Sequence, residues 1–267
     1  MIAALLIGRK GSTGFPGKNT FPILGRSMCL YPMLAALNSK YIDRVYVSTD
    51  DEKIIDIANQ KGVGVIHRPP ELCTKDALGE DAFVHGYRVI REIWLEEQIA
   101  SGIWRTENIE MVVLLMANAV TILAKTIDIG ISVLDKYPGL DSAVTVSRYN
   151  MWSPLRARKI EPIGLSDIDG LKPFIPFEAF GDPAILNCDR DSQGDVWFAD
   201  MGVSIVRPHC LENMENGLLP QKWMGRNIYP LKQEGGCDID YEWQAPGVEH
   251  WLLKRGFGFI KTPYDEE

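Results

Sequence analysis

A glycine-rich segment, residues 8–19, combines residue types that bind phosphate. It reads Gly-Arg-Lys-Gly-Ser-Thr-Gly-Phe-Pro-Gly-Lys-Asn and directly follows an apolar run. Glycines let backbone amides approach a phosphate closely, and the side chains of Arg9, Lys10 and Lys18 supply positive charge. The spacing fits neither the Walker A loop nor the G-x-G-x-x-G fingerprint. The segment therefore predicts a phosphate-binding loop of another type, with an ordinary exposed loop as the alternative.

Two acids near the other end of the chain, Asp238 and Asp240, are two residues apart. In an extended segment alternate side chains share one face, so both carboxylates would face one ligand. Mg²⁺ binds a few carboxylates and completes its shell with water and substrate phosphates. The pair is thus a candidate Mg²⁺ site, and a solvated strand end is the alternative. Asp167 and Asp169 have the same spacing, but Gly170 follows them and predicts a structural turn.

The elements that must position these residues follow from hydrophobic periodicity. Apolar runs predict strands at 2–7, 44–49, 63–67, 111–116, 142–147 and 203–206. Helical spacing predicts helices at 32–40, 51–61, 78–100 and 125–137. Strands that alternate with helices and are apolar on both faces predict an α/β fold with a mostly parallel sheet. The glycine-rich loop then leaves the carboxyl end of the first strand, where such sheets bind ligands.

Residues 150–200 interrupt this alternation with several prolines and few periodic runs. We expect an insertion or flap on a single domain of residues 1–267, which serves an acceptor site or a dimer contact. Arg156 and Arg158 in this insertion could pair with the carboxylate of an acidic ligand. A solvated charge run is the alternative.

The acidic residues Asp189, Asp191, Asp195 and Asp200 imitate the spacing of a calcium-binding EF-hand loop. The last position holds Asp instead of the bidentate Glu, and the apolar Trp197 occupies another ligand position. The flanks do not have helical periodicity either. We therefore expect these acids to make charged or hydrogen-bonding contacts to an acceptor instead of binding calcium.

Composition limits the classes of partner. The 267 residues carry 36 acids and 28 bases, a net charge of −8, which argues against nucleic-acid binding. No apolar run reaches the length of a membrane span. The first acid is Asp43, and five bases precede it, which favours an anionic ligand near the N-terminus. Five scattered cysteines without a C-x-x-C pair predict neither zinc nor disulfides, and a cytoplasmic location is expected.

Several motifs together resemble the CMP-sugar synthetases, which are the cytidylyltransferases of sialic acid, Kdo and related acidic sugars. The resemblance covers about residues 1–150 and 200–255. The matching motifs, in chain order, are the loop ending Pro-Gly-Lys-Asn at 9–19, Val-Ser-Thr-Asp-Asp at 47–51, Arg-Pro-Pro-Glu-Leu at 68–72, Gly-Glu-Asp at 79–81 and Asp-Ile-Asp at 238–240.

This resemblance implies a Rossmann-like, mostly parallel sheet of the nucleotide-diphospho-sugar transferase type with an inserted flap. It implies CMP transfer from CTP to the hydroxyl of an acidic sugar, with Mg²⁺ as cofactor, pyrophosphate as product, and a homodimer. Catalytic roles would fall to Arg9, Lys18 and Asp240, and metal binding to Asp238 and Asp240. The nucleotide would contact Gly8, Arg9, Gly11, Ser12, Gly14, Lys18, Asn19 and Arg68. The acceptor would contact Asn118 and, from the insertion outside the resemblance, Arg156 and Arg158. The apolar residues Phe174, Ile175 and Phe177 of the insertion also favour dimerisation.

The chain departs from the family pattern at two places. Thr13 stands where the family usually has Lys, and Leu-Met-Ala-Asn-Ala-Val at 115–120 replaces a Leu-Gln-Pro-Thr-Ser-Pro segment that helps to face the sugar. Two alternatives remain open. One is a cytidylyltransferase for another acceptor, such as a phosphonate. The other is a degenerate, non-catalytic nucleotide-binding module. A Rossmann dehydrogenase is disfavoured by the fingerprint spacing.

Overall fold

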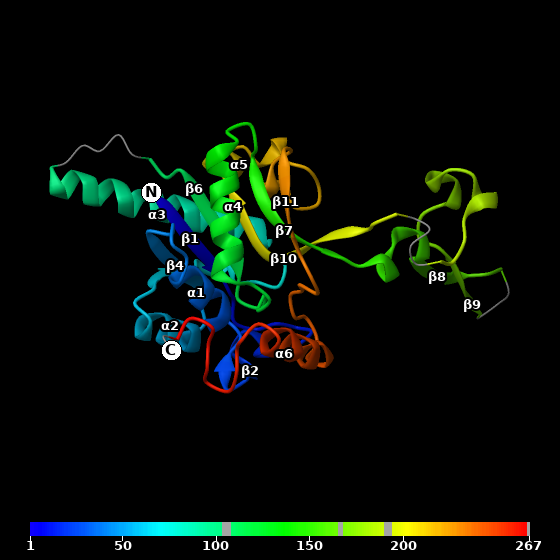
Figure 1. Cartoon of the computed structure of the whole chain (residues 1–267), viewed down its shortest axis with the longest axis horizontal. Coiled ribbons are helices and arrows are strands. Elements are labelled where there is room, and N and C mark those ends of the chain that lie inside the picture. The colour runs from blue at the N-terminus through cyan, green and yellow to red at the C-terminus, as the bar shows by residue number, and fades with distance from the viewer. Residues whose placement is uncertain (103–107, 165–167, 190–193, 266–267) are drawn as a thin grey trace. The chain divides into compact units, whose positions relative to one another are not determined.

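The structure is a computed structural model that describes residues 1–102, 108–164, 168–189 and 194–265. The chain divides into two compact units, one of Met1–Thr145 with Asp200–Glu267 and one of Val146–Ala199. Each unit is described by itself below, and Figure 1 shows the elements of both.

The first unit is built on a seven-stranded sheet with the strand order β11-β7-β10-β6-β1-β4-β5. Strand β1 is parallel to β4 and β6, β4 is parallel to β5, and β10 is antiparallel to β6. The predicted α/β fold with a mostly parallel sheet is therefore confirmed. The strands are β1 (Ile2–Ile7), β4 (Arg44–Thr49), β5 (Gly64–His67), β6 (Met111–Met116), β7 (Ser142–Arg148), β10 (Trp197–Val206) and β11 (Ile228–Gln233). A two-stranded ribbon adds β2 (Pro22–Ile23) and β3 (Arg26–Ser27).

Six α-helices accompany the strands in the described part of the chain. They are α1 (Leu30–Leu37), α2 (Glu52–Gln60), α3 (Gly79–Ser101), α4 (Ala124–Lys136), α5 (Pro208–Glu212) and α6 (Ala245–Leu253). Asp51 caps helix α2, because its side chain accepts a hydrogen bond from the backbone N–H of Lys53. The helix expected to reach residue 40 ends earlier, at Leu37. None of the described helices has the length and apolar character needed to cross a bilayer.

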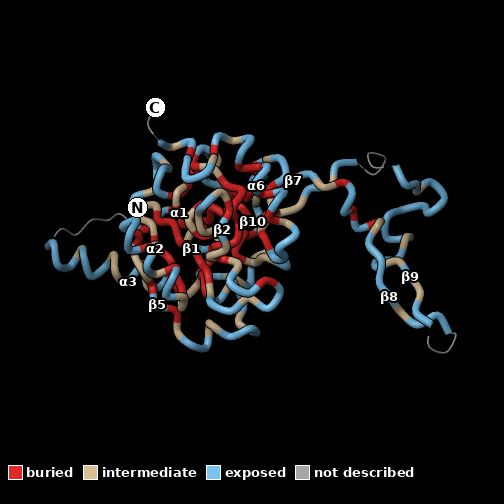
Figure 2. The backbone as a smooth tube through the Cα atoms, turned by 90° about the horizontal axis from the view of Figure 1, so that it is seen from below, coloured by how far each residue is buried: buried red, intermediate tan, exposed pale blue. Residues whose placement is uncertain are grey.

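Both faces of the sheet are covered, as the apolar strands require. On one face Leu6 belongs to a core cluster with buried residues of α1, α2 and α4. On the other face Leu5, fully buried, meets α3 at Gly86. Figure 2 shows this concentration of buried residues along the strands of the first unit. The two-sided burial holds the carboxyl ends of β1 and β6 at one edge, where the glycine-rich loop begins.

The second unit contains a hairpin of β8 (Arg158–Pro162) and β9 (Asp169–Pro173). Gly170 pairs with Glu161 in this hairpin, so the turn predicted at Asp169 and Gly170 is wrong and the chain is extended there. Asp167 lies outside the described residues. The hairpin exposes apolar side chains, with Ile160 70% and Leu171 74% exposed, and its strands are pale blue and tan in Figure 2.

Gly86 provides a test of the packing between α3 and β1. A Cβ atom there would lie 2.7 Å from Leu5 Cδ2 and 3.3 Å from Leu5 Cγ, so Leu5 as a whole would have to move. We expect Gly86→Ala to lower the free energy of unfolding, because overpacking costs about 1–3 kcal/mol and exceeds the gain of about 1 kcal/mol in helix propensity. Urea unfolding followed by circular dichroism measures the change.

Gly247 in α6 is the matched control, since it is exposed and a Cβ there meets nothing within 4 Å. Gly247→Ala should raise the free energy of unfolding by up to about 1 kcal/mol. Shifts of the same sign in both variants would contradict the packing described for α3.

Candidate active site

A small hydrophobic cluster lies beneath the candidate site and joins three distant segments. It contains Phe15 from the glycine-rich loop, Val120 from the chain after β6, and Ile239 from between the two acids. Val248 and Trp251 of α6 complete its wall. Burial of these side chains draws the loop, the end of β6 and the acidic segment together.

The glycine-rich loop is fixed at both of its ends. Gly8 donates its N–H to the Ser48 carbonyl at 3.2 Å, and a Cβ at Gly8 would lie 2.6 Å from Ala117 Cβ. At the far end the buried Asn19 donates from Nδ2 to the Arg9 carbonyl at 3.0 Å. This predicted nucleotide-binding residue thus closes the loop on itself.

Between these ends the backbone makes two left-handed turns that favour glycine. Gly11 has φ +80° and Gly17 has φ +74°. The Lys10 N–H donates to Asp50 Oδ1 at 2.7 Å, and Arg9 donates from its guanidinium to the Gly11 carbonyl at 3.2 Å. The Lys10 backbone and the Arg9 side chain therefore both hold the loop in a defined conformation.

The loop lies against the acidic segment. A Cβ at Gly14 would be 3.2 Å from the backbone oxygen of Asp240. Lys18 Nζ donates to Asp240 Oδ1 at 2.7 Å, and the Lys18 side chain is only 15% exposed. The structure thus brings together Gly14, Lys18 and Asp240, while Gly11 and Thr13 lie exposed and Ser12 half-buried on the same loop.

Asp238 and Asp240 flank Ile239, which is fully buried. Asn118 holds this segment, because its backbone carbonyl accepts from Ile239 N at 3.0 Å and its Nδ2 donates to the Ile239 carbonyl at 2.9 Å. The same Nδ2 lies 3.3 Å from Asp238 Oδ2. Asn118, predicted to bind the acceptor, is buried and contacts the acidic segment; its role toward an acceptor stays a prediction.

The surroundings of Asp238 disfavour the ionised form of its carboxyl. Burial raises the pKa of this carboxyl, and the neighbouring charge of Asp240 raises it further, while Lys18 opposes both effects. Burial also raises the pKa of Cys237 to about 11, with contributions from Asp238 and Asp200. The segment thus carries two carboxylates beside Lys18, and a bound cation would favour their ionised forms.

The pair fits the donor chemistry of Mg²⁺, which prefers carboxylate oxygens completed by water and phosphates. Among the residues that the structure describes, no group of three or more Asp, Glu, His or Cys could enclose a metal. A cation held by Asp238 and Asp240 would therefore depend on substrate oxygens for the rest of its shell.

Arg68 is buried beside β4. Its Nη2 donates to the Ser48 carbonyl at 2.8 Å, and its Nε lies 3.4 Å from Ser48 Oγ. Burial lowers the pKa of Arg68, and repulsion from Arg9 contributes to the same shift. Arg68 shares the Ser48 carbonyl with Gly8 at the start of the loop, and its contact with a cytidine stays a prediction.

Arg156 and Arg158 belong to the second unit and line a cavity of about 300 Å³ within it. Arg158 donates to the Leu155 carbonyl at 2.8 Å and lies over the Phe177 ring, 5.3 Å from its centroid. Arg156 donates to the Cys188 carbonyl. Both guanidinium groups thus already support the fold of this unit, and their role toward an acceptor is untested.

Two residues near the acidic segment escaped the sequence analysis. Thr121 Oγ1 accepts from Cys237 N at 2.9 Å and donates to the Cys237 carbonyl at 3.1 Å. Gln244 Oε1 accepts from the backbone N–H groups of Asp240 and Tyr241, at 2.7 and 2.8 Å. No sequence motif predicts these contacts, because the usual capping signature has Ser, Thr, Asp or Asn three residues before Gln, and Tyr241 occupies that position before Gln244.

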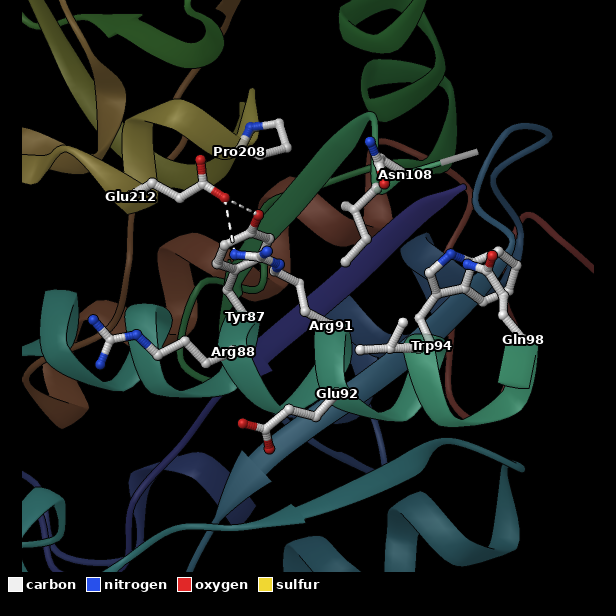
Figure 3. Close-up of a pocket in the computed structure, with 11 residues that line it drawn as sticks. Tyr87, Arg88, Arg91, Glu92, Trp94, Gln98, Asn108, Pro208 and Glu212 are labelled. Atoms are coloured by element: carbon white, nitrogen blue, oxygen red, sulfur yellow. Dashed lines mark hydrogen bonds and ion pairs between the residues drawn. The ribbon is translucent and has the colours of Figure 1, made fainter. Parts of the chain in front are cut away.

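A separate cavity of about 540 Å³ lies between α3, α5 and the start of β6 (Figure 3). Tyr87 Oη and Arg91 both donate to Glu212 Oε1, at 2.7 and 3.1 Å. The cavity is lined by Ile109, which precedes β6. Asn118 of the candidate site follows the other end of this strand. The cavity is therefore distinct from the candidate site.

The raised pKa of Asp238 gives a prediction for stability. A carboxyl whose pKa is higher in the folded state costs stability once pH rises above its unfolded value, about 3.9. We expect Asp238→Asn to raise the free energy of unfolding at pH 7, and this gain to shrink as pH falls toward about 4. Urea unfolding in EDTA at several pH values tests this.

Asp265 is the control of opposite sign. Hydrogen bonds from the Thr262 backbone N–H and hydroxyl lower the pKa of its carboxyl. Asp265→Asn should therefore lower stability at pH 7 and matter less in acid. A loss of stability at pH 7 in Asp238→Asn would refute the charge argument for the candidate site.

Comparison with known proteins places the matching region in the N-terminal part of the chain. Residues 3–83 match the family model described as Cytidylyltransferase. The N-acylneuraminate cytidylyltransferase of Streptococcus agalactiae serotype III (strain NEM316) is 35% identical over 79 residues, which are 29% of this chain and 19% of the relative. The CMP-N,N'-diacetyllegionaminic acid synthase of Legionella pneumophila subsp. pneumophila (strain Philadelphia 1) is 39% identical over 64 residues, 24% of this chain and 28% of that protein. The match thus spans less than a third of each relative.

Solved structures extend the comparison to the fold of almost the whole chain. A CMP:2-keto-3-deoxy-manno-octonic acid synthetase complexed with CTP superposes with a TM-score of 0.62 at 15% identity, covering 95% of this chain and 98% of that one. The 4-diphosphocytidyl-2C-methyl-D-erythritol synthase of Anaerococcus prevotii gives a TM-score of 0.56 at 12% identity, covering 94% and 96%. The predicted resemblance is therefore confirmed: in sequence over residues 3–83, and in fold over nearly its whole length, the chain resembles the cytidylyltransferases.

Proposed function

We propose that the protein is a cytidylyltransferase that transfers CMP from CTP to the hydroxyl of an acidic sugar and releases pyrophosphate. The observation that carries this proposal is the contact between Lys18 and Asp240 at 2.7 Å. It joins the predicted phosphate loop to the predicted metal segment across 222 residues of sequence. The named substrates of the sialic acid and legionaminic acid relatives support an acidic sugar as acceptor.

In the proposed reaction, the acceptor oxygen forms a bond to the α-phosphorus of CTP while the bond from that phosphorus to pyrophosphate breaks. The hydroxyl proton is released to solvent. Reactions of this kind depend mainly on positioning and charge neutralisation. Arg9, Lys18 and the amides of the Gly8–Gly17 loop would hold the triphosphate, with Lys18 exchanging Asp240 for a phosphate oxygen.

Asp238 and Asp240 would hold Mg²⁺, because both offer hard oxygen ligands and carry charge that protein partners leave only partly neutralised. When bound, the ion supplies charge neutralisation at the phosphates. Asn19 and Arg68 would place the cytidine, and Asn118, Arg156 and Arg158 the acceptor. The expected location is the cytoplasm.

The first experiment is a thermal-shift titration with CTP, UTP, ATP and GTP, each with and without Mg²⁺. A ligand that binds only the folded state raises the free energy of unfolding by mass action, by about 2.7 kcal/mol at a hundred times its Kd, and so raises Tm. We expect a rise that is selective for CTP and larger with Mg²⁺, followed by pyrophosphate release when an acidic sugar is added. A response to another nucleotide alone would refute the CTP assignment.

Asp240→Ala separates catalysis from mere binding. Loss of a charge-stabilising group at the phosphates should lower turnover about 100- to 1,000-fold, while circular dichroism stays that of the folded protein. Asp56→Ala on the exposed face of α2 is the control and should keep wild-type turnover. CTP binding without turnover in the wild-type protein, for all acidic sugars tried, would favour the non-catalytic module.

We also propose that the second unit forms a homodimer contact through its exposed apolar side chains, Ile160, Leu171 and Phe174. Large apolar groups left in water favour burial in an interface. Light scattering should give twice the 30.0 kDa chain mass for the wild type. Leu171→Glu should reduce the mass to that of a monomer, whereas Lys172→Glu, at the adjacent position of β9, should not. A wild-type monomer would overturn this part of the proposal.

A further inference from the structure

Asp200 lies in β10, near the ends of the strands that carry the candidate active site. Strand β10 is antiparallel to β6, with Val206 opposite Val112 and Ser204 opposite Leu114. The part of β10 before Ser204 therefore runs past the end of β6 toward Asn118. The sequence pattern predicts a contact of Asp200 with an acceptor, whereas the structure places this residue in β10, buried and hydrogen-bonded within the protein.

A local distortion of β10 buries the Asp200 carboxylate. Met201 has φ +60°, in the left-handed region that side chains with a Cβ rarely adopt. Across this bend Asp200 Oδ1 accepts a hydrogen bond from the Gly202 N–H at 3.2 Å. The side chain ends 4% exposed. Strained backbone of this kind costs about 1–3 kcal/mol and persists where the surroundings require it.

Gln233 connects the Asp200 carboxylate to the chain after β6. Its Nε2 donates to Asp200 Oδ2 at 2.9 Å and to the Thr121 carbonyl at 3.2 Å. An ionised carboxylate can only accept hydrogen bonds, so it obliges the amide nitrogen of Gln233, and not the oxygen, to face it. Asp200 thereby fixes the orientation in which Gln233 can hold Thr121.

The same pair lies directly against the acidic segment. A Cβ at Gly236 would come within 2.3 Å of Asp200 Oδ2 and 2.4 Å of Gln233 Nε2, so a larger residue there would displace this pair. The next residue, Cys237, is held at both its N–H and its carbonyl by the Thr121 hydroxyl. Asp200, Gln233 and Thr121 thus form a chain of contacts that ends one residue before Asp238.

We propose that Asp200 is a positioning residue that, through Gln233 and Thr121, fixes the backbone carrying Asp238 and Asp240 for binding Mg²⁺. The inference rests on the proposed function, because it needs those two carboxylates to hold the ion. It adds a residue from β10 that acts indirectly, through its hydrogen bond with Gln233. Partners beyond the direct ligands change metal affinity by about 10- to 100-fold when removed.

The test is Asp200→Asn, which keeps the shape of the side chain and removes its charge. The amide of Gln233 is then free to turn over, and its oxygen would face the Thr121 carbonyl, which repels it. At saturating CTP, the Mg²⁺ concentration that gives half of the metal-dependent Tm rise should increase about 10-fold. The Kd for CTP in EDTA should stay within twofold of wild type.

Asp56→Asn is the matched control, because this carboxylate lies on the exposed face of α2. Its Mg²⁺ midpoint should equal that of the wild type. A lower Tm in Asp200→Asn with an unchanged Mg²⁺ midpoint would overturn the positioning role and leave a structural one. If the wild type itself shows no Mg²⁺ dependence, the proposed metal site fails and this inference fails with it.

Discussion

Burial of one apolar side chain, Ile239, determines where the charges of the candidate site lie. Ile239 is fully buried in the cluster with Phe15 and Val120. Burying such a side chain is worth about 1.5–3 kcal/mol, and it leaves the neighbours on either side facing away from the core. The same cluster anchors the glycine-rich loop through Phe15. Non-directional hydrophobic contact therefore places groups whose chemistry is strongly directional.

The charges so placed are not arranged for stability. Lys18 neutralises Asp240, while Asp238 stays half-buried with a raised pKa. Met201 adds a left-handed backbone at the same edge of the sheet. A fold optimised only for stability would contain neither feature, since each costs free energy. Both are understandable if a cation and a polyphosphate complete the arrangement.

Strands β1, β4 and β6 could be predicted from the sequence to the residue, because each is a short apolar run in the middle of a sheet buried on both faces. Strand β11 was missed, since Pro230 breaks the signal; it lies at the sheet edge, where proline is tolerated. The first half of β10 was missed as well, because Asp200 is acidic and Met201 adopts a turn-like backbone. Contacts between residues far apart in the sequence could not be predicted either, because no local pattern encodes them.

The candidate site likewise contains features that could be predicted from local sequence and contacts that could not. Motif spacing identified the loop and the two acids, because their chemistry is local in sequence. The hydrogen bonds of Thr121 to Cys237 and of Gln233 to Asp200 join different elements, and no local pattern encodes them. The ion pair of Lys18 with Asp240 falls between these cases: both residues were singled out, but their contact was not.

Strands β7 and β10, through which the chain leaves the first unit and returns to it, are neighbours in the sheet. Adjacent strands are about 4.8 Å apart, so the 54 residues of Val146–Ala199 begin and end almost at one point. A segment attached in this way can lengthen, shorten or be exchanged for another without moving the strands that carry it. Evolution can thus vary one unit of the protein while the other keeps its register.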